Sequence, residues 1–535
     1  MQLKKFLPII LSVAVVTGIF IGTKINHPTT TTRFFPDQRF SEIDKLNEIL
    51  NFIEDSYVDS VDKTSLVEGT ISEMLENLDP HSYYISKEDY SAVNEPLEGN
   101  FEGIGVEFRI INDTIIVISP LDGGPSKRAG ILPGDRIIAV NDSVIAGTGI
   151  DNAGVMSLLK GPKGSQVRVT VYRKYSNEEI SFQLTRNRIP IKSIEAAFMI
   201  NDSIGYVKIS RFAKQTYDEF MEAVNNQLSD KLEKLILDLR NNGGGVLSEA
   251  TKIADEFLET DQLIVYTEGK ARNKKNYYAT SRGSLVHVEV VILINQSSAS
   301  ASEILAGALQ DNDRGTIMGR RSFGKGLVQE QIEWPDGSAL RLTVARYYTP
   351  TGRSIQKPYE NVEQYHLETY NRLENGELNS EDSIKVNDSL MFVTPGGKTV
   401  YGGGGIVPDI FIPLDSLLLN SYYSQMVQNG LLNQFTFEYV DGNRNKLNFK
   451  DPSDFKSKFN AGNDVLDQFI AYAQKESGKI NLIEIGKSKH LILTGLKSGI
   501  SRYLYGDQGY YEIRNEADND IQLAIQYLSG KKKGS

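Results

Sequence analysis

Residues 291–329 read VILINQSSASASEILAGALQDNDRGTIMGRRSFGKGLVQ. The apolar run Val288–Ile294 is short and rich in β-branched residues, as buried strands are. It gives way to small, mostly polar residues, and a helical pattern then begins at Glu303. Ser300 is therefore expected at the junction of a strand and a helix N-terminus. Backbone N–H groups are unpaired there and the helix dipole favours developing negative charge, which suits a serine nucleophile.

The same serine has a purely structural interpretation. Residues 300–303 fit the S-x-x-E capping box, in which Ser300 only caps the helix. A downstream lysine favours chemistry instead, because Lys325 lies between Gly324 and Gly326, and glycines let the backbone pass close to other groups. Burial disfavours the ammonium form and lowers a lysine pKa by up to ~3–5 units, so Lys325 can serve as a general base.

Together these motifs resemble the C-terminal processing peptidases, also called tail-specific proteases. The resemblance rests on S-A-S-A-S-E, a glycine-flanked lysine and a following glutamine. It implies a Ser–Lys dyad without histidine, with Ser300 as nucleophile, Lys325 as general base and Gln329 as a supporting residue. Asp311 matches an acidic position with a supporting role. Four residues along an extended strand span ~13 Å, so Gln329 contacts Lys325 only if the chain turns, and otherwise acts through neighbours.

Composition excludes several classes of function. The chain has 535 residues, long enough for about three or four domains, and a net charge of -11. This charge argues against nucleic acid as a partner, because phosphate binding needs a positive surface. The absence of cysteine removes disulfides, thiol catalysis and cysteine metal sites. The five histidines form no H-E-x-x-H pair, so we expect neither a catalytic metal nor a cofactor.

The N-terminus has the pattern of a signal sequence. Lys4 and Lys5 precede an apolar run from Phe6 to about Thr23, and no A-x-A cleavage site follows. At about 18 residues the run is barely long enough to span a bilayer. We expect residues 1–33 to form an uncleaved inner-membrane anchor and linker, with the positive end inside. The catalytic part would then lie in the cell envelope, in the periplasm or otherwise outside the cytoplasm. Cleavage of the segment is the alternative.

Residues 34–98 are expected to be a helical region. Apolar residues recur at helical spacing in two runs, Ile43, Leu46, Ile49, Leu50 and Ile53, then Leu66, Ile71, Met74, Leu75 and Leu78. The stretch LDPHSYY at residues 78–84 resembles one that precedes the second domain in this peptidase family. His81 within it is interpreted as structural, because a Ser–Lys site needs no imidazole.

Residues 99–186 resemble an inserted PDZ domain. A glycine turn, GIGV at residues 103–106, leads into an alternating strand, and AGILPGD follows at residues 129–135. The resemblance implies that a substrate's C-terminal carboxylate is held by Gly103, Ile104, Gly105 and Val106. The strand edge would pair with the peptide by β-augmentation. A structural strand entry without a ligand is the alternative.

Residues 187–415 are expected to form an α/β core, for which the resemblance implies a crotonase- or Clp-like peptidase fold. Apolar patterns predict strands at 204–209, 235–239 and 338–346, and helices at 216–228 and 248–258. Residues 360–393 are polar and irregular and are expected to be an exposed insertion. The glycines at 402–405 predict a turn rather than a phosphate loop, because no strand and helix flank them suitably.

The loop DLRNNGGG at residues 238–245 lies between a predicted strand and a predicted helix. This arrangement binds anions through backbone N–H groups. A nucleotide phosphate is the rival ligand, but the loop lacks both G-K-[ST] and G-x-G-x-x-G. The string resembles the oxyanion-hole segment of the peptidase family, with Gly243, Gly244 and Ala301 as N–H donors. Asp238 and Arg240 are expected to brace the loop.

Residues 416–535 are expected to form an α-rich C-terminal domain. Helical patterns occur at 417–431, 465–474 and 521–528, and Lys531–Lys533 predict a solvated end. The domain is expected either to cover the core or to make a contact in a homodimer.

The whole sequence predicts a multidomain α/β serine endopeptidase that cleaves peptide bonds through an acyl-enzyme. Its expected partners are protein or peptide substrates with accessible C-termini, and the membrane through the N-terminal segment. A non-catalytic PDZ adaptor of the envelope is the rival class, and the presence of both dyad residues counts against it. A latent peptidase, switched on by a substrate tail or an activating adaptor, is a further alternative.

Overall fold

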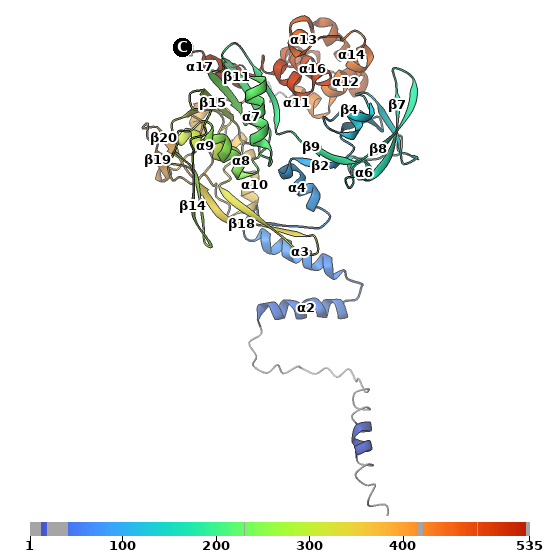
Figure 1. Cartoon of the computed structure of the whole chain (residues 1–535), viewed down its shortest axis with the longest axis vertical. Coiled ribbons are helices and arrows are strands. Elements are labelled where there is room, and N and C mark those ends of the chain that lie inside the picture. Colours follow the sequence, from blue (N-terminus) through green and yellow to red (C-terminus); the bar gives the residue numbers. More distant parts are fainter. Residues whose placement is uncertain (1–11, 19–40, 229–230, 416–420, 479, 531–535) are drawn as a thin grey trace, which may run out of the picture. The chain divides into compact units, whose positions relative to one another are not determined.

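The computed structural model describes residues 12–18, 41–228, 231–415, 421–478 and 480–530. It divides into two units, Met1–Thr70 and Ile71–Ser535 (Figure 1). The predicted N-terminal helices are α2 (Glu42–Ser56) and α3 (Lys63–Glu76), with α3 crossing the division. Ser41 caps α2 by a capping box with Asp44. Of the predicted anchor, only residues 12–18 are described. Among the described residues, no helix has both the length and the apolar character to cross a membrane.

A six-stranded, mostly parallel sheet forms the centre of the second unit. Its strand order is β10-β11-β12-β15-β16-β21, and only the β10–β11 pair is antiparallel. Strands buried on both faces read as continuous apolar runs, which is why the sequence predicts β11, β12 and β15, whereas β10, β16 and β21 were not predicted. The strands are β10 (Ile194–Met199), β11 (Ile204–Ile209), β12 (Lys234–Asp238), β15 (Glu289–Ile294), β16 (Gly315–Gly319) and β21 (Ile410–Phe411).

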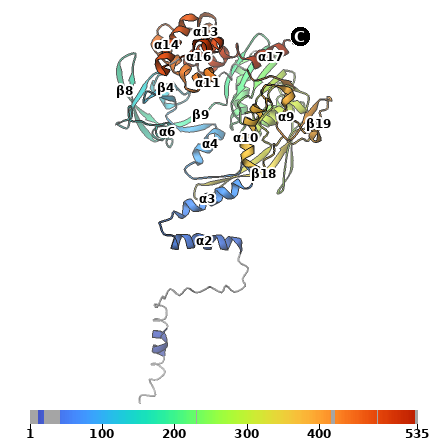
Figure 2. The same ribbon diagram turned by 180° about the vertical axis from the view of Figure 1, so that it is seen from behind.

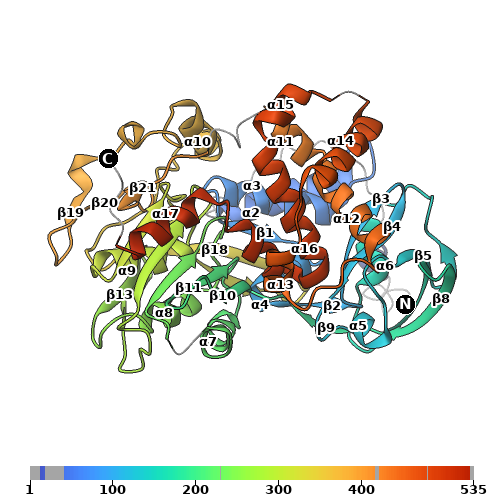
Figure 3. The ribbon, with the colours of Figure 1, turned by 90° about the horizontal axis from the view of Figure 1, so that it is seen from above.

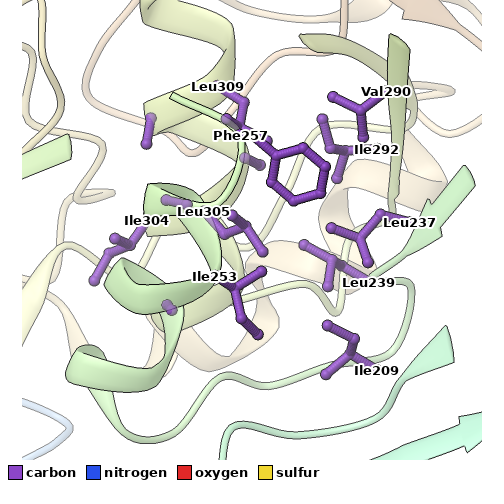
Figure 4. Packing of buried hydrophobic residues seen from close by; sticks show 14 of the residues in the cluster. Ile209, Leu237, Leu239, Ile253, Phe257, Val290, Ile292, Ile304, Leu305 and Leu309 are labelled. Carbon is purple, nitrogen blue, oxygen red and sulfur yellow. The ribbon is translucent and has the colours of Figure 1, made fainter. Parts of the chain in front are cut away.

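Alternate residues of these strands face two separate apolar layers. On one face, Leu237 and Ile292 pack against α8 (Leu247–Asp255) and α9 (Ala301–Asp311), as Figure 4 shows. The helix α7 (Thr216–Gln227) adds Phe220 to the same layer. The other face packs against α17 (Asn519–Leu528) through Ile521, Ala524 and Leu528, and Figure 3 shows α17 beside this sheet. The sheet therefore has helices on both faces.

A second, antiparallel sheet contains β17 and β18, which follow α9 and β16 in the chain. Its path is β1-β18-β13-β14, and β17 pairs with β18 as well. The stretch LDPHSYY enters this sheet as β1, which pairs with β18. The strands are β1 (Tyr83–Ile85), β13 (Leu263–Gly269), β14 (Arg272–Tyr278), β17 (Leu327–Glu333) and β18 (Ala339–Tyr348).

The region predicted as a PDZ domain is a separate antiparallel sheet with two helices and its own apolar core. The helix α4 (Tyr90–Glu98) precedes it. The strands β2 (Asn100–Gly103) and β9 (Asn187–Pro190) pair with each other, so the segments that lead into and out of the domain lie side by side. Its elements are β3 (Val106–Ile111), β4 (Thr114–Pro120), α5 (Pro125–Ala129), β5 (Arg136–Val140), β6 (Ser143–Val144), α6 (Asn152–Leu159), β7 (Gln166–Arg173) and β8 (Glu178–Thr185).

The prediction of an exposed irregular insertion at residues 360–393 is wrong over its first half. The helix α10 (Val362–Glu374) lies there, and it buries Tyr365 and Arg372. The glycines at 402–405 form a turn, as predicted, and together with α10 they line a cavity of about 640 Å³. The remaining elements are η2 (Glu381–Ser383), η3 (Asp388–Leu390) and the pair β19 (Met391–Val393) with β20 (Thr399–Tyr401).

The C-terminal domain is helical, as predicted, with an apolar core of its own. Four of its helices, α12, α13, α15 and the long α16, have no counterpart in the sequence prediction, which ends its first helix at residue 431, where α12 begins. Residues 416–420 and the basic tail at 531–533 lie outside the described residues. The helices before α17 are α11 (Ser421–Gln428), α12 (Leu431–Asn443), α13 (Pro452–Lys458), α14 (Asn463–Ser477), α15 (Leu482–Lys487) and α16 (Lys489–Arg514).

This domain covers the core, which was one of its two expected roles. The side-chain amide of Gln508 bonds both the N–H and the carbonyl of Ala197 on edge strand β10, at 3.1 and 3.0 Å. It also reaches the PDZ-like sheet, beside which Figure 2 shows it, through an ion pair of 3.1 Å between Arg136 and Asp441. The dimer contact stays a prediction.

Candidate active site

Ser300 lies between β15 and α9, where the sequence places it. It is the residue before the helix, with φ 54° and ψ -113°. A residue other than glycine in such a conformation costs about 1–3 kcal/mol, so the surroundings must hold it. Ser298 does so in part: its hydroxyl accepts the Asn295 N–H and donates to the Leu239 carbonyl, both at 2.9 Å. The turn therefore presents a half-buried serine in a strained conformation.

The glycine loop after β12 lies directly against this serine. A Cβ added to Gly244 would lie 2.7 Å from the Cβ of Ser300 and 2.6 Å from the Ala299 carbonyl, and Gly244 has φ +95°. Only glycine fits at this contact. The Gly244 N–H donates to the Asn242 side chain at 2.9 Å. Within the described residues, the N–H groups of Gly243 and Ala301 have no hydrogen-bond acceptor. The predicted oxyanion segment and the predicted nucleophile are therefore brought together, with two of the three predicted donors free within the described residues.

Asn242, which the sequence analysis did not single out, joins three segments. Its carbonyl accepts the Ala299 N–H at 3.0 Å and the Ser302 hydroxyl at 2.9 Å. Its buried side chain donates to the Ile209 carbonyl at 3.0 Å. The only signal in the sequence was an asparagine immediately before a glycine run. This residue fixes the distance between the glycine loop and the serine turn.

Glu303 connects the serine turn to the lysine loop. Its Oε2 accepts the backbone N–H of Ser300 at 2.8 Å and that of Lys325 at 2.9 Å. Its Oε1 accepts the Gly324 N–H at 2.7 Å and the Ser322 hydroxyl at 2.5 Å. The side chain is fully buried. Burial raises the pKa of Glu303, while these four donors favour its charged form. Glu303 thus completes the carboxylate half of the capping box and also anchors the lysine.

Tyr347 on β18 makes a second link between the same two segments. Its hydroxyl donates to the Lys325 carbonyl at 2.7 Å and lies 3.2 Å from the Ser300 carbonyl. Burial raises the pKa of Tyr347 well above its ordinary value, so the phenol stays a donor. The sequence analysis missed this residue, because only the pairing of β17 with β18 brings it here.

Lys325 is half-buried and electrostatically suited to lose its proton. Burial lowers the pKa of Lys325, and the positive charge of Arg341 acts in the same direction. The carboxylates of Glu303 and Asp79 oppose this shift. Within the described residues, the Lys325 Nζ makes no hydrogen bond or ion pair. A lysine in such a position can accept a proton.

Gln329 lies on β17 beside a bulge that follows Val328. Its amide donates to the Thr343 hydroxyl at 3.2 Å, and that hydroxyl donates to Asp79 at 3.1 Å. Within the described residues it makes no hydrogen bond to Lys325. The network instead ends at Asp79, whose charge acts on the pKa of Lys325. Gln329 therefore reaches the lysine through neighbours, which was the second of the two expected arrangements.

His81 lies in an aromatic cluster next to the lysine loop. Its Nε2 is 2.6 Å from the hydroxyl of Tyr365, and the two rings meet edge to face. Tyr365 in turn meets the ring of Phe323 edge to face. Burial, and after it the charge of Lys325, lowers the pKa of His81 to about 4. A neutral, hydrogen-bonded imidazole in an aromatic cluster fits the structural interpretation.

Asp311 lies at the end of α9 opposite to Ser300. A separation of 11 residues corresponds to roughly 16 Å along a helix. Its fully buried carboxylate is paired with Arg353 at 2.6 Å and accepts the Thr351 hydroxyl at 2.7 Å. The structure thus places Asp311 in the scaffold behind the site and not beside the dyad.

The predicted carboxylate loop of the PDZ-like domain lies between β2 and β3. The carbonyl of buried Ile104 accepts the N–H of Ser126 at 3.0 Å and its hydroxyl at 2.8 Å. Gly105 has φ +76° and its carbonyl accepts the Leu121 N–H at 3.0 Å. Gly103 ends β2, and Val106 begins β3, which is an edge strand. A turn held through its carbonyls, next to a free strand edge, can present N–H groups to a peptide terminus.

Four parts of the chain match known families. Residues 203–363 match peptidase family S41, and residues 103–184 match the PDZ domain. Residues 22–89 match the activating protease CtpB N-terminal domain. Residues 422–506 match a family of unknown function.

Curated relatives match 60–64% of this chain. The carboxy-terminal-processing protease of Bartonella bacilliformis is 35% identical over 347 residues, which are 64% of this chain and 79% of that protein. The carboxy-terminal processing protease CtpB of Bacillus subtilis is 34% identical over 326 residues, or 60% of this chain and 67% of that protein. Among solved structures, the photosystem II D1 C-terminal processing protease matches with 26% identity and a TM-score of 0.35, covering 69% of this chain and 93% of that one.

Proposed function

The chain belongs to the carboxy-terminal processing proteases of peptidase family S41, and from this premise we propose that Ser300 and Lys325 form its catalytic dyad. The protein is a serine peptidase with a PDZ domain, and its relatives support this reading over a non-catalytic adaptor. One observation supports the dyad above all others. The backbone N–H groups of both residues donate to a single oxygen of Glu303, which holds the two loops in one register.

In the proposed mechanism, neutral Lys325 takes the proton from the Ser300 hydroxyl as its Oγ attacks the scissile carbonyl. The oxyanion that forms accepts N–H bonds from Gly243 and Ala301, whose donors are free. Gly244 shapes the hole by its close approach, and it adds a third donor if its N–H leaves Asn242. The proton passes to the leaving amine, and water then hydrolyses the acyl-enzyme. Each donor in such a hole typically contributes ~2.7–4 kcal/mol of transition-state stabilisation.

Substrate selection is proposed to depend on the substrate's own C-terminus. The turn Gly103–Val106 would bind the terminal carboxylate, and the edge of β3 would pair with the last residues of the tail. Amidation of a model substrate removes the terminal charge without changing the peptide bonds. Cleavage should weaken on amidation, and equal cleavage of the two forms would remove this part of the proposal.

The test of the dyad compares wild type, Ser300→Ala and Lys325→Ala, each prepared from residues 34–535. Each protein is incubated with an unfolded protein that carries an apolar C-terminal tail, and the fragments are read by mass spectrometry. Cleavage by wild type alone is the expected result. Equal cleavage by all three proteins would place the activity elsewhere. If no protein cleaves but the tail still binds, the result favours a non-catalytic PDZ adaptor or a latent enzyme that needs an activating adaptor.

We further propose an envelope location, with residues 6–23 as a membrane anchor. The support is the sequence pattern of two lysines before an apolar run. A homodimer is proposed as well, because α2 leaves Leu46, Ile49 and Phe52 39%, 47% and 71% exposed at three-residue spacing on one side of the helix, and a face of this kind suits a second copy. Membrane fractionation of the full chain, with and without residues 1–33, tests the first proposal. Light scattering of wild type and Phe52→Asp tests the second.

A further inference from the structure

A single carboxylate of the C-terminal helix connects the two loops of the proposed site. The Oδ2 of Asp520 on α17 lies 3.1 Å from a guanidinium nitrogen of Arg240 and 3.1 Å from one of Arg320. All three side chains are largely buried, with Asp520 9% exposed, Arg240 13% and Arg320 7%. At this burial an ion pair is screened little by water or salt.

Each of the two arginines lies near the start of a loop that contains proposed catalytic residues. Arg240 follows β12 and precedes the glycines that approach Ser300. Arg320 follows β16 and precedes the loop of Lys325. These two strands flank β15, whose end leads to Ser300 itself. Asp520 therefore links the loop after β12 to the loop after β16, which lie on either side of β15, the strand that leads to Ser300.

The helix that supplies Asp520 is held in place by other contacts. Ile521, Ala524 and Leu528 pack on the sheet face opposite to α8 and α9. The Lys234 ammonium bonds the Leu528 carbonyl at the other end of the helix. Loss of the Asp520 charge should therefore leave α17 docked.

The two arginines depend on Asp520 to different degrees. Arg240 keeps Asp238 at 2.7 Å and Asp518 at 2.9 Å. Arg320 has Asp520 as its carboxylate partner within the described residues, and its other contacts are neutral, the Ile412 carbonyl at 3.1 Å and the side-chain oxygen of Gln296 at 3.4 Å. Loss of the Asp520 charge would therefore leave the buried Arg320 guanidinium without a carboxylate partner at the start of the loop that contains Lys325.

We propose that Asp520 is a positioning residue for catalysis, which holds the oxyanion loop and the lysine loop in register from the C-terminal helix. This inference rests on the proposed roles of Ser300 and Lys325. It gives α17 a positioning role in the reaction, although the proposed mechanism includes no residue of the C-terminal domain. The expected consequence of its loss is misplacement of reacting groups, which lowers kcat and spares substrate binding.

The variants are Asp520→Asn, which keeps the shape and removes the charge, and Asp520→Glu, which restores a carboxylate. Asp518→Asn removes a carboxylate that contacts Arg240 and not Arg320. Glu516→Gln is the matched control, because its carboxylate is 50% exposed and pairs with Lys456. Steady-state cleavage of a tailed peptide gives kcat and KM. Binding of the same peptide to each variant in the Ser300→Ala background gives the ground-state affinity.

Asp520→Asn is expected to lower kcat about tenfold to a hundredfold, with KM and peptide affinity within about twofold of wild type. Asp520→Glu should recover part of the loss, and Glu516→Gln should match wild type. If Asp520→Asn loses its circular dichroism spectrum, the neutral pair Asp520→Asn with Arg320→Gln replaces it, with the same kcat loss expected. Wild-type kcat in either variant, while Ser300→Ala is inactive, overturns this inference alone. Wild-type activity of Ser300→Ala would instead overturn the proposed dyad.

Discussion

Ser300 and Lys325 share one hydrogen-bond acceptor: their backbone N–H groups lie 2.8 and 2.9 Å from the same carboxylate oxygen of Glu303. The two residues belong to loops after different strands, β15 and β16. A buried carboxylate that serves both loops couples the position of the proposed nucleophile to that of the proposed base. The stability of this arrangement depends on Glu303 accepting all of its donors, because an unsatisfied buried donor costs about 1–3 kcal/mol.

Glu303→Gln tests this coupling. The amide keeps the size of the carboxylate but replaces one acceptor oxygen with an NH₂ group, so at least two of the four donors lose their acceptor. We expect the free energy of unfolding to fall by about 2–5 kcal/mol and kcat to fall at least about tenfold. Urea unfolding and peptide cleavage measure the two effects. Glu330→Gln is the control, since Glu330 is exposed and pairs with Arg272. Wild-type kcat in Glu303→Gln would contradict the coupling.

Two neighbouring glycines of the oxyanion loop are expected to differ in their tolerance of alanine. Gly244→Ala forces a Cβ to within 2.6 Å of the Ala299 carbonyl at φ +95°, so we expect loss of activity. The same change should destabilise the fold by about 1–3 kcal/mol. At Gly243 a Cβ meets no atom within 4 Å, and alanine keeps the N–H donor. Gly243→Ala should therefore keep wild-type stability. Cleavage rates and thermal unfolding compare the two, and equal behaviour would show that the loop does not lie against Ser300.

The pH profile of kcat/KM should give the pKa of Lys325, the proposed base. Lys325 acts as a base only when neutral, so activity is lost as the pH falls through its pKa. Burial and the Arg341 charge lower this pKa below the ordinary 10.5, so the acidic limb of the profile should have its midpoint below that value. Removal of a nearby positive charge stabilises the ammonium form. Arg341→Gln should therefore move the limb to higher pH.

The control for this profile is Arg272→Gln, which removes an arginine of the same sheet whose partner is Glu330. Its limb should coincide with that of wild type. A limb that moves to lower pH in Arg341→Gln would contradict the assignment of Lys325 as the base.

His81 predicts a particular acid sensitivity of the fold. Its pKa is lowered from 6.5 to about 4, so the unfolded chain binds more protons than the folded protein between these values. The contribution to stability is complete above pH 6.5 and is lost as the pH falls toward 4. His81→Gln cannot titrate and should flatten this part of the curve.

Urea unfolding midpoints at pH 7 and pH 5 measure this slope for wild type and His81→Gln. His490→Gln is the control, because His490 is exposed. An unchanged slope in His81→Gln would show that His81 does not set the acid sensitivity.

The sequence predicted the elements whose patterns follow from local physics. The strands of the central sheet are buried on both faces, so β12 and β15 read as continuous apolar runs. The junction at Ser300 could also be predicted from the sequence, because a strand, small residues and a helix follow one another without interruption. The helix α10 could not be predicted from the sequence pattern. It buries Arg372, whose guanidinium bonds the carbonyls of Arg321, Ser322 and Phe323, and a charged residue normally indicates a solvated face.

The family, the order of the predicted catalytic motifs and the strands β11, β12 and β15 could all be read from the sequence, because each depends on residues close together in the chain. Only the tertiary structure decided how the loops meet. Glu303, Tyr347 and Asp520 act on segments far from them in sequence, through hydrogen bonds and ion pairs that form once β17 pairs with β18 and α17 packs on the sheet. No local pattern encodes such contacts, because their free energy depends on burial that the whole fold supplies.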